Sequence, residues 1–192
     1  MAKHGAGEGF MARPIPFLRV DKPLMVFGGP YSNLEATRAV LDEAARVSIS
    51  PDRIICTGDV VAYGADAAAT VDLVRDRVGH VVMGNCEQSL AAGSDDCGCG
   101  FPTGSSCERL SAAWFAYASR ALNNDARSWM ADLPRRIYVE IGGCRLAVIH
   151  GGVDRITASF LHPPRPQSNS KRSERPRSTV SWAAIAVCRS LR

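Results

Sequence analysis

The order of apolar and polar positions predicts alternating strands and helices in the first half of the chain. Leu24–Phe27 is a short apolar run that stops at Gly-Gly-Pro, as expected for a buried strand that enters a loop. Arg53–Cys56 and His80–Met83 repeat this pattern, and Ala67–Arg77 between them carries valines at helical spacing. Strands that alternate with helices favour right-handed crossovers and a largely parallel sheet. The pattern therefore predicts an α/β fold.

The remaining elements follow from capping and turn signals. Ser32 and Glu35 have the spacing of a capping box, which predicts that a helix begins there. Residues 91–107 are rich in Gly, Ser and Cys and are expected to form a loop. Helices are predicted over 107–122 and 125–133. A hairpin is predicted for 137–141 and 145–149, because Gly-Gly between them suits a tight turn.

Composition divides the chain into three parts. We expect a flexible extension over residues 1–20, one domain over 21–154, and a basic, disordered tail over 155–192. The tail holds eight Lys or Arg side chains and a single acidic one, Glu174. Such a charge excess permits nucleic-acid binding, but few aromatic residues accompany it, so this interpretation is not favoured.

Hydropathy and cysteine usage bear on compartment and metal chemistry. No apolar run reaches the roughly 20 residues that cross a bilayer, and no export signal is visible, so we expect a cytoplasmic protein that does not enter membranes. Seven cysteines are then expected to be mostly reduced thiols. Four of them fall within 22 residues, and thiolates prefer zinc or iron. One hypothesis is therefore a second metal centre, formed by Cys97, Cys99 and Cys107, with or without Cys86.

Four loops at predicted strand ends together resemble the calcineurin-like metallophosphoesterase family. They are Asn33 before a helix, Gly58-Asp59-Val60-Val61, Gly84-Asn85-Cys86-Glu87, and His150-Gly151. The resemblance spans residues 24–153 and implies an αββα sandwich, incomplete at its C-terminal end. It also implies a two-metal hydrolase of phosphate esters, in which Asp59, Asn85 and His150 are metal ligands and Asp59 bridges the two ions.

The sequence departs from the family pattern at several ligand positions. The first loop of the family reads Asp-x-His-Gly-Asn, whereas this chain has Gly29 and Tyr31 in place of the two ligands. Glycine has no donor atom, and an un-ionised phenol is a poor ligand. Cys86 stands where the family has a histidine, and the terminal Gly-His-x-His motif is absent. The resemblance therefore implies that Asp59, Asn85 and His150 form most of one metal site, and that the other site is impaired.

These observations give a leading hypothesis and an alternative. The first is a hydrolase of small phosphate mono- or diesters that uses a divalent ion of Mn, Fe or Zn. In it, Asp59 and Cys86 are catalytic, and Asn33 and Tyr31 bind substrate. The alternative is a non-catalytic fragment of the same fold, with a Cys-bound structural zinc or iron. Each site residue also has a purely structural interpretation. Asp59 could cap the following turn, His150 could be a hydrogen-bonded residue at a strand end, and Tyr31 could have a packing role.

Overall fold

The computed structural model describes residues 14–152 and residue 156. Within these residues six strands form two sheets of three, with five α-helices and one short 3-10 turn. The strands are β1 (Phe17–Val20), β2 (Met25–Phe27), β3 (Ile54–Cys56), β4 (His80–Val81), β5 (Arg136–Ile141) and β6 (Cys144–Ile149). The helices are α1 (Leu34–Arg46), α2 (Ala67–Arg77), α3 (Asn85–Ala92), α4 (Ser106–Ala121) and α5 (Asn124–Ala131), and the turn η1 spans Pro51–Arg53.

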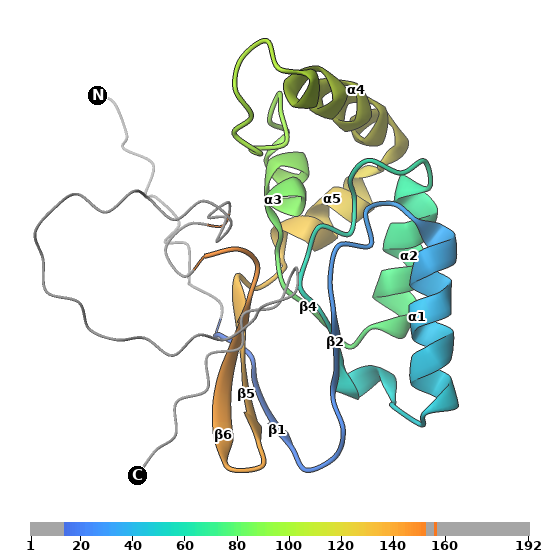
Figure 1. Ribbon diagram of the computed structural model, residues 1–192, viewed down its shortest axis with the longest axis vertical. Coiled ribbons are helices and arrows are strands. Elements are labelled where there is room, and N and C mark those ends of the chain that lie inside the picture. The colour runs from blue at the N-terminus through green and yellow to red at the C-terminus, as the bar shows by residue number, and fades with distance from the viewer. Residues whose placement is uncertain (1–13, 153–155, 157–192) are drawn as a thin grey trace, which may run out of the picture.

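The two sheets pack face to face, with the helices on one side (Figure 1). The sheet β2-β3-β4 is entirely parallel, as the alternating pattern predicts. In the sheet β1-β5-β6, β1 pairs parallel with β5, and β5 and β6 form the predicted antiparallel hairpin. The predicted mixed α/β sandwich is thus confirmed, and the described residues supply a helix layer and both sheets.

Two apolar clusters hold these layers together. The smaller one lies between the sheets, where Ile55 and Val82 meet Ile137, Val139 and Val148. The larger cluster joins β3 to the helices and includes Leu41 of α1, Val71 and Val74 of α2, Leu90 of α3 and Met130 of α5. Because β3 is buried on both faces, its run of apolar side chains has no polar alternation.

Several expectations differ from the structure. Strand β1 begins at Phe17, inside the segment 1–20 that was expected to be flexible, because its backbone pairs with β5 far along the chain. The cap of α1 is Asn33, whose side chain accepts from the Ala36 N–H, and not Ser32. The Ser32 side chain instead accepts from the Ala62 N–H in another loop. The predicted tail 155–192 lies, apart from residue 156, outside the described residues.

Helix α3 was missed in the sequence, because Gly84-Asn85-Cys86-Glu87 was interpreted only as a loop. The helix begins at Asn85, directly after the Gly84 cap, and ends at Ala92, where Gly93 caps it in the left-handed conformation. None of the helices in residues 14–152 is long and apolar enough to cross a membrane.

Candidate metal site

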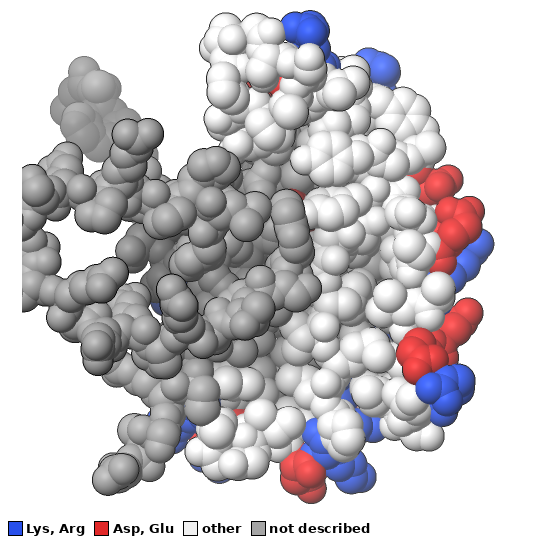
Figure 2. Space-filling view, in the orientation of Figure 1, with Lys and Arg blue, Asp and Glu red and all other residues white. Residues whose placement is uncertain are grey.

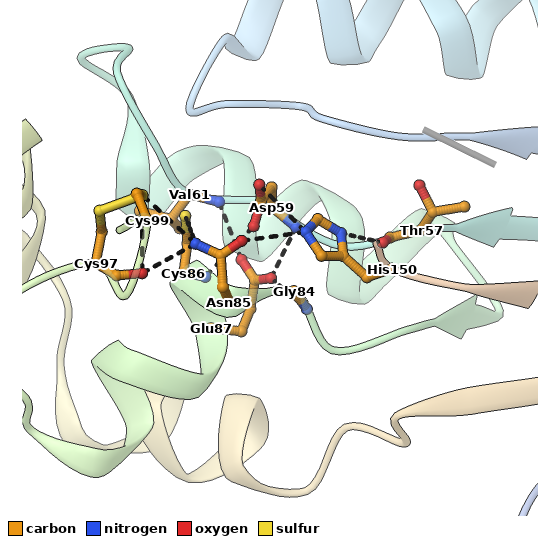
Figure 3. A network of polar contacts seen from close by, with 10 residues as sticks. All are labelled: Thr57, Asp59, Val61, Gly84, Asn85, Cys86, Glu87, Cys97, Cys99 and His150. Carbon is orange, nitrogen blue, oxygen red and sulfur yellow. Dashed lines mark hydrogen bonds and ion pairs between the residues drawn. A yellow bond between two sulfur atoms is a disulfide. The ribbon is translucent and has the colours of Figure 1, made fainter. Parts of the chain in front are cut away.

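The loops that follow β3, β4 and β6 converge at one rim of the sandwich (Figure 3). Asp59 comes after β3, Asn85 starts the helix after β4, and His150 directly follows β6. The carboxyl ends of β3 and β4 meet at the same edge of their parallel sheet, and the facing sheet adds the end of β6. The structure therefore brings together the three residues that the resemblance implies as metal ligands.

A hydrogen bond to the main chain orients the His150 ring. Its Nδ1 lies 2.8 Å from the carbonyl oxygen of Thr57. Since a carbonyl oxygen only accepts, Nδ1 carries the proton and donates it. In the neutral ring the lone pair is then on Nε2, the atom that faces Asn85 and Asp59. This is the usual arrangement of a metal-binding histidine, in which the second nitrogen is held by an outer partner.

The amide of Asn85 is oriented in the same way. Its Nδ2 donates to the Cys97 carbonyl oxygen at 2.9 Å. This contact assigns the amide, so that Oδ1 points at His150 Nε2, 3.2 Å away. An amide oxygen and a neutral ring nitrogen are both acceptors, so they do not bond to one another without a cation between them.

Asp59 completes the arrangement with its carboxylate. One oxygen, Oδ2, lies 3.5 Å from His150 Nε2, and the other, Oδ1, accepts from the Cys86 N–H at 3.3 Å. Three lone-pair atoms thus converge in a place where the side chains of Asp59 and His150 are only 12% and 16% exposed. A positive charge stabilises this arrangement, either a proton on Nε2 or a metal ion.

The donor set fits a single divalent ion of borderline character. Carboxylate oxygen, amide oxygen and imidazole nitrogen are ligands that Mn, Fe and Zn accept in proteins. No group of three or more His, Cys, Asp or Glu side chains within residues 14–152 is arranged to hold a metal ion, so the amide of Asn85 is needed to complete a set of three. The roles of Asp59, Asn85 and His150 as ligands stay predictions.

Glu87 is a site residue that the sequence did not single out. Its fully buried carboxylate accepts from the N–H groups of Asp59 (2.8 Å), Gly84 (3.0 Å) and Val61 (3.2 Å). Burial, followed by the charge of Asp59, raises the pKa of Glu87 to about 7, against the lowering effect of these three hydrogen bonds. The side chain ties the loop after β3 to the start of α3. The Gly-Asn-x-Glu spacing carried this information, because the position three after a cap is where an acidic side chain reaches back.

The two loops also approach so closely that only glycine fits at position 84. A Cβ atom there would lie 2.4 Å from Asp59 Oδ1 and 2.5 Å from Asp59 N. The side chain of any other residue would therefore displace the Asp59 carboxylate.

The first loop is not arranged to hold a second metal as the family does. The ring of Tyr31 lies over Gly29, where a Cβ atom would be 2.3 Å from Tyr31 Cε2. The tyrosine thus fills the space into which an aspartate at position 29 would project. Burial, and then the charge of Asp59, raises the pKa of Tyr31 to about 12, so it stays a neutral phenol. The residues present do not fit the second ion of a two-metal site.

The two predicted substrate-binding residues differ in their surroundings. The Asn33 side chain is engaged as the cap of α1, through the Ala36 N–H at 2.9 Å. Tyr31 is partly exposed at 36%, and its N–H donates to the Asp59 carbonyl oxygen at 3.1 Å. Tyr31 therefore lies beside the candidate metal site, and its contact with a substrate stays a prediction.

Three of the four clustered cysteines, Cys86, Cys97 and Cys99, are drawn together, but not as thiolates. Cys97 and Cys99 are joined in a disulfide, their Cα atoms 5.3 Å apart, which differs from the expectation of reduced thiols. Cys99 Sγ and Cys86 Sγ lie 3.5 Å and 3.6 Å from Asn85 Nδ2. Cys107 is exposed on the first turn of α4, apart from the other three among the described contacts. Sulfur in a disulfide is no thiolate, so a zinc or iron centre remains a prediction for the reduced chain only.

Cys86 was predicted as a catalytic residue or ligand, and it is buried. Burial raises the pKa of its thiol strongly, and the nearby charges of Asp59 and Glu87 raise it further. A protonated thiol is a weak nucleophile and a weak ligand. These surroundings favour the interpretation of Cys86 as a small packed residue beside the ligands over that of a nucleophile.

Comparison with known proteins gives one family. Residues 22–183 match the family model for the calcineurin-like phosphoesterases, so the match continues beyond the boundary predicted at residue 154. The chain is 27% identical over 131 residues to the uncharacterized protein MJ0912 of Methanocaldococcus jannaschii. This alignment covers 68% of the chain but only 50% of that relative, so the chain spans about half its length.

Two solved structures are similar to this one. The hypothetical protein PH1004 of Pyrococcus horikoshii has a TM-score of 0.58 and 16% identity, over 74% of this chain and 60% of that one. A metallophosphoesterase of Sphaerobacter thermophilus has a TM-score of 0.43 and 24% identity, over 60% of this chain and 44% of that one. At these identities the first likeness bears on the fold alone.

Proposed function

The chain belongs to the calcineurin-like phosphoesterase family, and on that premise we propose that it hydrolyses phosphate mono- or diesters with a single divalent ion. Asp59, Asn85 and His150 would hold the ion, which is Mn, Fe or Zn. The observation that carries the proposal is the convergence of three acceptor atoms, with His150 Nε2 3.2 Å from Asn85 Oδ1 and 3.5 Å from Asp59 Oδ2.

The bound ion would supply Lewis-acid polarisation of a phosphoryl oxygen and thereby stabilise charge that develops in the transition state. The residues around it supply rigidity. The Thr57 carbonyl fixes the His150 tautomer, the Cys97 carbonyl orients the Asn85 amide, and Glu87 holds the Asp59 main chain. These contacts preorganise the ligands before any ion or substrate arrives.

The proposal is tested by metal-dependent hydrolysis with the full chain. Purified protein is stripped with a chelator and assayed on p-nitrophenyl phosphate and bis(p-nitrophenyl) phosphate, with Mn, Fe and Zn added separately. We expect no turnover in the stripped protein and recovery with at least one of the three ions. Bound metal without turnover on either ester would instead make the chain a non-catalytic member of its family.

A further inference from the structure

The structure has a cavity of about 530 Å³ between the loop after β2 and the start of α1. It is lined by Phe27, Pro30, Tyr31, Val40 and Tyr63, together with glycines of the loop after β2 and polar groups of the first turn of α1. Among the residues that the structure describes, no Lys, Arg, Asp or Glu side chain lines it. On the face of the molecule drawn in Figure 2, the described residues are largely uncharged, and the charged side chains gather along its edges, including the edge formed by α1.

Main-chain hydrogen bonds join this cavity to the site. The N–H of Gly29 donates to the Gly58 carbonyl oxygen at 3.2 Å, and that of Tyr31 donates to the Asp59 carbonyl oxygen at 3.1 Å. The loop that lines the cavity therefore lies against the loop that carries Asp59. The cavity and Asp59 are thus carried by two loops that contact each other.

Two aromatic rings stand at this cavity. Tyr31 and Tyr63 have ring centroids 5.4 Å apart and an interplanar angle of 54°. Their side chains remain accessible, Tyr31 at 36% and Tyr63 at 58%. The ring of Trp114 packs edge-on against the ring of Tyr63, with the centroids 5.4 Å apart. Accessible, supported aromatic rings are surfaces on which planar groups stack.

The backbone holds both tyrosines in an unusual conformation. Tyr31 has a φ of 50° and Tyr63 a φ of 33°, in the left-handed region that side-chain-bearing residues avoid. The Gly64 N–H donates to the Tyr31 carbonyl oxygen at 3.0 Å, which ties the two segments together. Such conformations persist only where the surroundings impose them, and they concentrate at ligand sites.

We propose that Tyr31, Tyr63 and the adjoining cavity form a subsite for a planar aromatic ring in the organic part of the phosphate ester. The subsite occupies the region of the missing second metal, because Tyr31 lies over Gly29. The chain then selects esters by ring stacking beside one ion. This inference rests on the proposed function and adds the class of substrate to it.

The test compares two non-hydrolysable phosphonates on the Mn-loaded full chain by titration calorimetry. Phenylphosphonate is expected to bind about tenfold more tightly than methylphosphonate, because stacking of one aromatic ring on another typically increases affinity by up to about this factor. Tyr63→Ala is expected to reduce this ratio to nearly one, with the affinity for methylphosphonate unchanged. Phe17→Ala, which removes an exposed ring on β1 in the other sheet, is the matched control and is expected to keep the ratio.

A second pair of ligands, measured in the same way, distinguishes a nucleobase from a simple aryl group as the ring that binds. Adenosine 5′-monophosphate against ribose 5-phosphate reports on a nucleobase, and the phenyl pair reports on a simple aryl group. A preference for the ring in either pair, lost in Tyr63→Ala, supports the subsite. Equal affinities within both pairs overturn the subsite but leave the phosphoesterase proposal standing. Failure of all four ligands to bind overturns both.

Discussion

Asp59→Asn is expected to lower the affinity for Mn²⁺ at least about 100-fold, since even outer-shell changes at metal sites cost 10- to 100-fold. The substitution keeps the size of the side chain but removes its negative charge. The carboxylate of Asp59 presents an acceptor oxygen both to the Cys86 N–H and toward His150 Nε2. The asparagine amide has only one oxygen, so its NH₂ group must face one of these two partners. Hydrolysis of p-nitrophenyl phosphate is expected to be lost together with the bound ion.

The measurement is calorimetric titration of the stripped protein with Mn²⁺, with circular dichroism to show that the variant folds. Asp42→Asn, which removes an exposed carboxylate on α1, is the matched control and is expected to bind Mn²⁺ like the unchanged chain. Equal Mn²⁺ affinity of the Asp59 variant would remove Asp59 from the ligand set.

Glu87→Ala is expected to lower the free energy of unfolding by about 3–5 kcal/mol, as removal of one partner from a buried polar network does. The variant leaves the buried N–H groups of Asp59, Gly84 and Val61 without their acceptor. Glu87→Gln is expected to cost less, because an amide oxygen can still accept from Asp59 and Gly84, while the NH₂ group faces Val61.

Urea unfolding followed by circular dichroism gives the free energies of unfolding of the unchanged chain and of the two Glu87 variants. Glu35→Ala, at an exposed position in the first turn of α1, serves as the control and is expected to change stability by less than about 0.5 kcal/mol. A Glu87→Ala variant as stable as the control would show that these hydrogen bonds do not hold the site loops together.

The sequence alone predicted the elements that local patterns specify. Helix α2 has the predicted bounds, Ala67–Arg77, because its spaced valines and flanking polar residues define a buried stripe. The β5–β6 hairpin follows from Gly142-Gly143, both of which have positive φ. The rim positions of Asp59 and Asn85 were also foreseen, since loops after adjacent parallel strands meet at one edge. His150 was expected at the same rim from the second strand of the hairpin, and it lies there at the end of β6 in the facing sheet.

Features that depend on distant contacts could not be predicted in this way. Strand β1 has a charged residue, Arg19, among its four residues and is stabilised by pairing with β5, far along the chain. The Tyr31 and Tyr63 rings lie next to one another although they come from different loops, and no periodicity of the sequence reports that contact. The Ser32 side chain bonds in another loop, so Asn33 became the helix cap. The Cys97–Cys99 disulfide was missed because the expectation rested on compartment and not on geometry.

The central claim is that Asp59, Asn85 and His150 hold one divalent ion. It is tested most directly by a crystal structure of the full chain grown with Mn²⁺, with anomalous scattering recorded at the manganese edge. We predict one strong peak within coordination distance of Asp59 Oδ2, Asn85 Oδ1 and His150 Nε2, and no peak above Gly29. A peak bound only to cysteine sulfurs, or no peak near His150, would contradict the account.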